Sequence, residues 1–207
     1  MQRILTVVVI GGLLAGFCVA AEPEEAVAKP APARAVALVA VGPVDETLAR
    51  KVGDFVQQDI RLPVRLLPPQ KAVGGTLDAE GEAAAKLMGE GDVCLVALVS
   101  PAEDIAAHGV GLSAQHVAAL NVKALQPADG DQEKLARRLE KETMRSIGSL
   151  LGMSSCPNPQ CVMWVHSTLD EMDAKSRSFC PPCLEKVRNA ATANGIMLIP
   201  MTVGAMP

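Results

Sequence analysis

The chain has 207 residues, of which 49% are hydrophobic and only 2% aromatic, and its formal net charge is −4 at pH 7. This composition argues against a nucleic-acid partner, because phosphate backbones are bound by a basic face and single strands by stacking on aromatic rings. The length suits one compact domain with one hydrophobic core.

The N-terminal segment has the pattern of a secretory leader. Arg3 provides a short positive head, residues 4–15 form an apolar run, and small residues follow up to Ala21. This order predicts a signal peptide over residues 1–21, so that the mature protein is exported to the periplasm or the extracellular space. The alternative is an uncleaved membrane anchor, because residues 4–21 carry no charge and are about long enough to span a bilayer.

Residues 22–34 differ in composition from the rest of the chain. Alanine, glutamate and proline dominate, with prolines at positions 23, 30 and 32. Such a segment has too few large apolar side chains to form a core, and it predicts an extended linker. The folded domain is therefore expected over residues 35–207.

The first half of that domain alternates apolar runs with amphipathic segments. Residues 35–41 and 93–99 are continuous apolar runs, which is typical of strands buried on both faces. Cys94 lies in the second run and is expected to be a core residue. Strand, helix and strand in succession predict an α/β fold built in layers. The other predicted elements are helices from the N-cap Asp45 to about residue 58 and over 78–88, and strands over 62–67 and 117–125.

Gly109 and Gly111 form a short glycine pattern between two of these elements. It lacks the third glycine and the later acidic residue of a dinucleotide-binding loop, so we interpret it as a turn. A longer amphipathic helix is predicted from about residue 131 to residue 151, and Gly152 is suited to end it. The charged run over 131–141 is expected to be a solvated face, and Glu142 is expected to pair with Arg145 one turn later.

Four of the six cysteines form two close pairs after this helix. Cys156 and Cys161 have the spacing C-x4-C, and Cys180 and Cys183 have the spacing C-x2-C. Short loops of this kind can converge four thiolates on one tetrahedral ion, which predicts a structural zinc site. One alternative is a disulfide within each pair, since an exported chain meets an oxidising compartment. Another is a redox protein built on the C-x2-C pair.

The cysteine segment resembles a known family. Gly152-x-x-x-Cys156-Pro-Asn-Pro-x-Cys161-Val-Met, followed by Phe179-Cys180-x-x-Cys183, is similar to the signature of the archaemetzincins, a group of zinc metallopeptidases. The resemblance implies a compact metzincin-like domain, with a mixed twisted sheet packed against helices and a zinc loop toward the C-terminus. It also implies that one structural zinc is held by Cys156, Cys161, Cys180 and Cys183.

The histidine half of the family signature, H-E-x-x-H-x-x-G-x-x-H, is replaced. Counted back from Cys156, its three histidines fall on Arg145, Ser149 and Ser155, and its glutamate falls on Ser146. Arginine cannot lose its proton to become a ligand, and serine hydroxyls are poor zinc ligands and poor general bases. The resemblance therefore implies no catalytic zinc and no catalytic residue, and it predicts a protein that works by binding a peptide or protein in the former substrate cleft.

An enzymatic alternative remains, namely a zinc metallopeptidase with a rearranged catalytic site. The histidines available for it are His108, His116 and His166. Of these, His166 follows the Val162-Met163 turn and is placed to approach the former cleft. A lone histidine in a loop is usually solvated or hydrogen-bonded, and we expect that of His166.

The last predicted elements of the folded domain are a helix over residues 184–193 and a short strand over residues 196–200.

Overall fold

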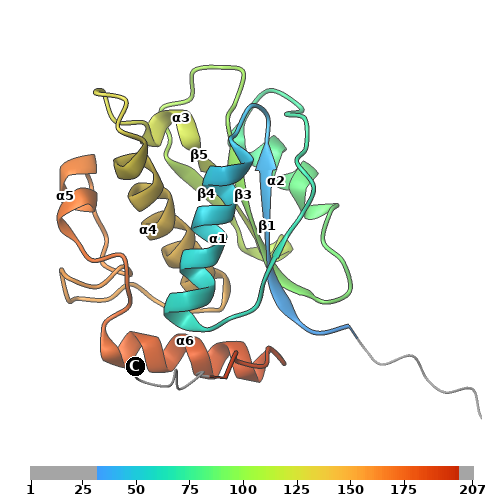
Figure 1. Cartoon of the computed structure of the whole chain (residues 1–207), viewed down its shortest axis with the longest axis vertical. Coiled ribbons are helices and arrows are strands. Elements are labelled where there is room, and N and C mark those ends of the chain that lie inside the picture. The colour runs from blue at the N-terminus through green and yellow to red at the C-terminus, as the bar shows by residue number, and fades with distance from the viewer. Residues whose placement is uncertain (1–31, 201–207) are drawn as a thin grey trace, which may run out of the picture. The chain divides into compact units, whose positions relative to one another are not determined.

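The computed structural model describes residues 32–200 as an α/β domain (Figure 1). The predicted signal peptide and most of the predicted linker lie outside the described residues, as do residues 201–207. The centre is a five-stranded sheet in the order β2-β1-β3-β5-β4. It is mixed, because β4 alone runs antiparallel to its neighbour. The strands are β1 (Ala35–Val41), β2 (Val64–Leu66), β3 (Asp92–Val99), β4 (Gly109–Leu112) and β5 (Val117–Asn121). The predicted fold class is confirmed.

Helices cover both faces of the sheet. Alternate side chains of a strand point to opposite faces, so the run in β1 serves two cores. Val36, Leu38 and Ala40 join the core beneath α1, α4 and α6. Ala37 and Val39 join a second core beneath α2. The helices are α1 (Glu46–Ile60), α2 (Leu77–Ala85), α3 (Val122–Leu125), α4 (Gln132–Leu150), α5 (Leu169–Ala174) and α6 (Pro181–Ala193), and a 3₁₀ turn, η1 (Ser113–Gln115), precedes β5.

The helix α4 has well-defined ends. The side chain of Asp131 accepts hydrogen bonds from the backbone N–H groups of Glu133 and Lys134, which caps the first turn. Gly152 follows the last turn with φ of 86°, a left-handed conformation that glycine adopts without strain. The predicted bounds of this helix are therefore correct to within one residue at each end. Its central part lies against the sheet and its C-terminal end leads into the cysteine segment (Figure 1).

The charged run over 131–141 is not a solvated face throughout, and that prediction was wrong. Arg138 and Lys141 are buried because the segment around α5 covers them and supplies their partners. The guanidinium of Arg138 donates to both carboxylate oxygens of Asp173, at 2.8 and 2.7 Å. The ammonium of Lys141 donates to the backbone carbonyls of Met172 and Asp173. These contacts fasten the segment around α5 to α4.

Three further predictions about elements are corrected. The Gly109-x-Gly111 pattern is not a turn but most of β4, where a Cβ at position 109 would come within 2.8 Å of the Leu120 side chain. The strand expected over 117–125 ends at Asn121, whose side chain accepts from the N–H of Ala124 and caps α3. Residues 196–200 form no strand, although the N–H of Ile199 donates to the carbonyl of Arg61.

The cysteine segment contains two helical features that differ from expectation. The short helix α5 was not predicted, and α6 begins at Pro181 rather than at residue 184. Proline suits the first helical positions, because the N–H that it lacks has no partner inside the helix there. No helix in the described part of the chain is long and apolar enough to cross a membrane.

Candidate functional site

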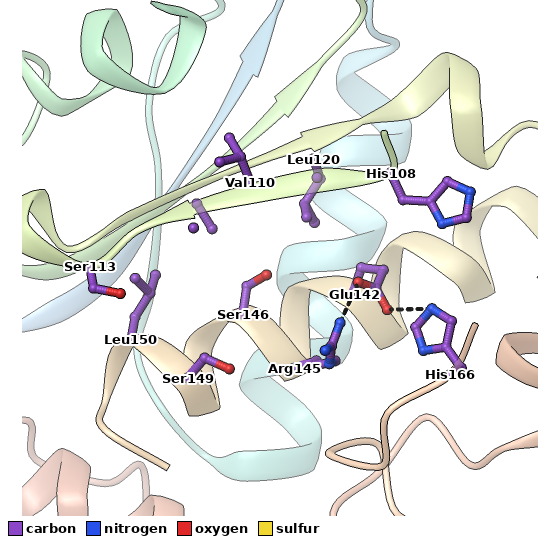
Figure 2. Close-up of a pocket in the computed structure, with 13 residues that line it drawn as sticks. His108, Val110, Ser113, Leu120, Glu142, Arg145, Ser146, Ser149, Leu150 and His166 are labelled. Atoms are coloured by element: carbon purple, nitrogen blue, oxygen red, sulfur yellow. Dashed lines mark ion pairs between the residues drawn. The ribbon is translucent and has the colours of Figure 1, made fainter. Parts of the chain in front are cut away.

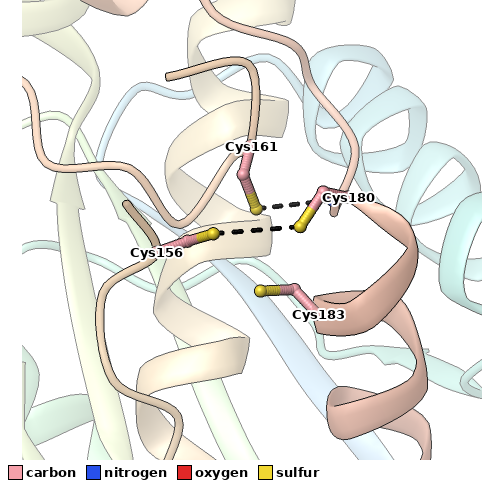
Figure 3. Close-up of side chains that lie close together, drawn as sticks. All are labelled: Cys156, Cys161, Cys180 and Cys183. Atoms are coloured by element: carbon pink, nitrogen blue, oxygen red, sulfur yellow. Dashed lines mark hydrogen bonds between the residues drawn. The ribbon is translucent and has the colours of Figure 1, made fainter. Parts of the chain in front are cut away.

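The four predicted zinc ligands come together at one point (Figure 3). Cys156 and Cys161 lie in the loop after α4, Cys180 is the N-cap of α6, and Cys183 lies in the first turn of that helix. The four sulfur atoms all lie within 4.8 Å of one another, and those of Cys156 and Cys180 are 3.8 Å apart. The loop after α4 and the start of α6, which are separated in the chain by α5, thus place their four thiols close together.

Backbone hydrogen bonds hold the first pair of cysteines in place. The N–H of Cys156 donates to the carbonyl of Met163, and the N–H of Cys161 donates to the carbonyl of Asn158. The N–H of Cys180 donates to the sulfur of Cys161 at 3.4 Å, which links the two pairs. The loop is further anchored because Met163 is buried below the last turns of α4.

Gly148 permits this close approach of the loop to α4. A Cβ at this position would lie 2.7 Å from the sulfur of Met163 and 3.2 Å from the ring of Phe179. Both distances are shorter than ordinary van der Waals contact, so a side chain at this position would force the Met163 and Phe179 side chains to move. The packing of α4 against the loop that carries the cysteines therefore depends on this glycine.

The thiol cluster has the dimensions and chemistry of a tetrahedral zinc site. Sulfurs bound at about 2.3 Å from zinc are separated by about 3.8 Å, which is the distance between the sulfurs of Cys156 and Cys180. Burial raises the pKa of the Cys161 thiol, and burial together with the neighbouring sulfurs raises the pKa of Cys183. A divalent cation among them would stabilise the thiolates and reverse this effect. By contrast, burial and Asp92 raise the pKa of Cys94 to about 12, as expected for an inert core thiol.

A cavity of about 330 Å³ lies on the other side of α4, between this helix and the strands β4 and β5 (Figure 2). Arg145, Ser146 and Ser149 line it from the helix. His108 precedes β4 and also borders the cavity, and His166 borders it from the loop after Cys161. Two of the three remaining histidines therefore reach the cavity.

A buried chain of polar groups supports one wall of this cavity. The Lys175 side chain has no exposed surface, and its ammonium donates to the carbonyls of Val162 and Trp164 and to Nδ1 of His166, 3.0 Å away. Because Nδ1 accepts, the proton of the neutral imidazole is on Nε2, which lies 3.6 Å from Oε1 of Glu142. The same oxygen is 3.9 Å from the Lys175 ammonium.

Burial sets the charge states in this group. Burial, together with the smaller effects of the positive charges of Lys175 and Arg145, lowers the pKa of His166 to about 4. Burial also lowers the pKa of Lys175 to about 8, against the opposing effect of Glu142. At neutral pH His166 is therefore uncharged, as predicted for a hydrogen-bonded loop histidine, and Lys175 is mainly protonated.

Acidification is expected to destabilise the folded protein through His166. The unfolded imidazole binds its proton near pH 6.5 and the folded one only near pH 4, so the unfolded chain binds more protons between these values. Stability is thus fully present above pH 6.5 and falls toward pH 4, by about 2 kcal/mol. Urea unfolding at pH 7 and 4.5 measures this loss. His166→Asn keeps an acceptor for Lys175 but does not titrate, and should lose about 2 kcal/mol less than the unaltered protein.

An equal loss of stability in both proteins would contradict this role of His166. It would mean that the acid sensitivity arises from carboxylates alone, since these are present in both.

The remaining predicted residues fall in several places. Glu142 and Arg145 pair as expected, with Oε2 and Nη1 3.5 Å apart. Ser155 lines a separate depression next to Cys156, away from Arg145 and the other two serines. Sequence reasoning missed the buried role of Lys175, because a lysine in a polar segment carries no signal that distinguishes a buried ammonium from a solvated one.

Comparison with known proteins agrees with this geometry. Residues 104–189 match the model of peptidase family M54. An archaemetzincin from Pyrococcus abyssi is 37% identical over 62 residues, which are 30% of this chain and 33% of that protein. An archaemetzincin from Thermococcus kodakarensis is 32% identical over 83 residues, which are 38% of this chain and 45% of that protein. The chain thus spans less than half the length of these curated relatives.

Two solved structures share the fold over a larger part of the chain. The archaemetzincin from Methanopyrus kandleri has a TM-score of 0.63 at 20% identity, covering 77% of this chain and 96% of that one. A zinc-dependent peptidase from Methanocorpusculum labreanum has a TM-score of 0.60 at 18% identity, covering 73% of this chain and 99% of that one. At sequence identities this low, the similarity to these two structures shows a shared fold only.

Proposed function

The chain belongs to the archaemetzincin family, and from this premise we propose that it is an exported, catalytically inactive relative of these zinc peptidases. In this proposal one structural zinc is bound by Cys156, Cys161, Cys180 and Cys183. The protein acts by binding a peptide or protein segment in the cavity beside α4, without cleaving it.

The side chains that α4 presents to the cavity carry this proposal. Arg145, Ser146 and Ser149 line it together, at the positions where the family signature has a histidine, the glutamate and a second histidine. A guanidinium keeps its charge and repels a cation, and two hydroxyls cannot replace the missing ligands and base. Within residues 32–200, the four cysteines are the only group of three or more His, Cys, Asp or Glu side chains that converges closely enough for a metal.

The edge of the sheet supports the binding of an extended segment. In the described part of the chain β4 pairs only with β5, so the backbone groups on its other side are open to a further strand. Peptides commonly add to such an edge, with main-chain hydrogen bonds giving affinity and pockets selecting side chains. The cavity of about 330 Å³ beneath β4 is within the range of ligand pockets. Export is proposed from the leader pattern of residues 1–21 alone.

Metal analysis combined with an activity assay tests the proposal. The purified mature chain should contain one zinc ion. It should bind peptides without hydrolysing them, and adding zinc should not produce hydrolysis. A second zinc whose removal by a chelator abolishes hydrolysis would instead establish the rearranged metallopeptidase. Zinc-free protein with reversible thiol oxidation would favour the redox alternative. Sequencing the N-terminus of protein recovered outside the cytoplasm tests the predicted cleavage after residue 20 or 21.

A further inference from the structure

Among the described residues, the guanidinium of Arg145 has no hydrogen-bond partner. Its side chain is 35% exposed, and its nearest charged neighbour in residues 32–200 is Glu142, at 3.5 Å. This nitrogen–oxygen distance is too long for a hydrogen bond. Arg138, on the same helix, shows the contrast, because its guanidinium makes three hydrogen bonds to Asp173 and to the carbonyl of Leu125. Arg145 therefore retains its donors for a molecule in the cavity (Figure 2).

Arg145 shares the carboxylate of Glu142 with a second cation, Lys175, so its charge is only partly offset. Glu142 is buried, and its Oε1 has no hydrogen-bond partner but lies 3.9 Å from the ammonium of Lys175. That ammonium is wholly buried and cannot reach a ligand. His166 is uncharged at neutral pH. One negative and two positive charges leave a net charge of about +1 in this group, and Arg145 is the one of the two cations that borders the cavity.

The chemistry of the other walls narrows the class of possible ligands further. Ser146 and Ser149 present hydroxyls on the helix side, while Leu120 and Leu150 present apolar surface (Figure 2). A single guanidinium matches the planar carboxylate group, which it can bind through two parallel hydrogen bonds. A net charge of +1 suits a monoanion better than a doubly charged phosphate. The last residue of a peptide offers both a carboxylate and an apolar side chain from one Cα atom.

We propose that Arg145 binds the C-terminal carboxylate of a peptide, whose last side chain packs on Leu120 and Leu150. This inference rests on the proposed function, because it names the part of the peptide that the cavity recognises. It predicts that the protein selects chain ends with a free carboxylate and an apolar last residue. Internal peptide segments and amidated ends leave the guanidinium without a partner.

Two matched peptide pools test this inference on the mature zinc-loaded chain. Both contain N-acetylated tripeptides ending in leucine, one with a free C-terminal carboxylate and one with an amide. Retention by the protein during ultrafiltration, measured by mass spectrometry, gives the relative affinity. The acid pool should bind at least about tenfold more tightly, since a hydrogen-bonded charge pair contributes about 1.5–3 kcal/mol. Arg145→Gln should reduce its affinity to that of the amide pool.

Control variants and competing anions complete the design. Arg137→Gln removes an exposed arginine from the same helix and should leave both affinities unchanged. Arg145→Lys keeps the charge but not the paired donors, and should bind with intermediate affinity. Because Arg145 is partly exposed, both of its variants should retain the thermal unfolding temperature of the unaltered chain. If a variant unfolds, the comparison of the acid and amide pools on the unaltered chain still shows whether the free carboxylate is recognised.

Each outcome has a distinct meaning. Equal binding of the acid and amide pools overturns the role of the carboxylate but leaves peptide binding intact. Absence of binding by both pools contradicts the proposed function itself. If sodium acetate competes as effectively as the acid pool at equal concentration, the cavity recognises small free carboxylates, and the assignment to peptide ends is wrong.

Discussion

Replacing Cys161 with serine is expected to abolish zinc binding and to destabilise the folded protein by at least about 3 kcal/mol. A structural zinc contributes folding free energy directly, on the order of 10 kcal/mol in isolated zinc-binding peptides. Cys161 is fully buried, and its sulfur also accepts the N–H of Cys180, so the substitution disturbs the link between the loop and α6. Zinc content by mass spectrometry and thermal unfolding followed by circular dichroism measure the two effects.

The matched control is Cys94→Ala. This residue is equally buried, but it lies in β3 far from the other thiols in sequence, and it belongs to the hydrophobic core. Its truncation should cost about 1–2 kcal/mol of packing energy and leave the zinc content unchanged. A strong chelator should lower the unfolding temperature of the control protein and of the unaltered chain, but not that of Cys161→Ser.

Two results would contradict the zinc assignment. The first is full zinc content in Cys161→Ser, which would place the metal elsewhere. The second is an unaltered chain that contains no zinc and is destabilised by a reducing agent, as expected if each cysteine pair forms a disulfide. The convergence of all four sulfurs on one point, rather than in two separate pairs, is the geometric reason to expect the metal.

Lys175→Met is expected to destabilise the protein by about 3–5 kcal/mol at pH 7, the usual effect of removing one partner of a buried charged pair. The ammonium is wholly buried and makes three hydrogen bonds, two of them to the carbonyls of Val162 and Trp164. Its loss leaves these carbonyls without that donor and removes one of the two cations close to Glu142, the other being Arg145. Urea unfolding at pH 7 measures the change in the free energy of unfolding.

Two comparisons make this experiment specific. Lys71→Met alters an exposed lysine and should change stability by less than about 0.5 kcal/mol. Adding Glu142→Gln to Lys175→Met removes the buried carboxylate that faced the lost ammonium and should recover part of the lost stability, so the two substitutions should be non-additive. Unchanged stability in Lys175→Met would show that the buried ammonium has no structural role.

The thiol cluster and the polar wall of the cavity are coupled through one short segment. Val162 and Trp164, whose carbonyls accept from Lys175, directly follow Cys161 in the chain. The loop is therefore held from one side by the thiols and from the other by the ammonium. Loss of either anchor is expected to displace His166, which the same segment carries into the cavity.

Local patterns in the sequence determine much of this fold. The apolar runs of β1 and β3 are long enough, and rich enough in β-branched residues, that burial on both faces of a sheet is their only favourable state. The ends of α4 are set by Asp131 and Gly152, whose effects are local to one turn. The cysteine spacing likewise limits how two loops can converge, which is why the four thiols were placed together correctly.

Only the tertiary structure decided the surroundings of the charged side chains and the edge of the sheet. Gly109 and Gly111 become a strand because β5 supplies their hydrogen bonds, and glycines have no intrinsic preference that reveals this. Arg138 and Lys175 are buried because carboxylates and carbonyls from segments distant in sequence satisfy their donors. By itself, the sequence determined the two buried strands β1 and β3, the long helix α4 and the convergence of the four thiols. The cavity that Arg145 borders depends on contacts between distant segments, which no local pattern encodes.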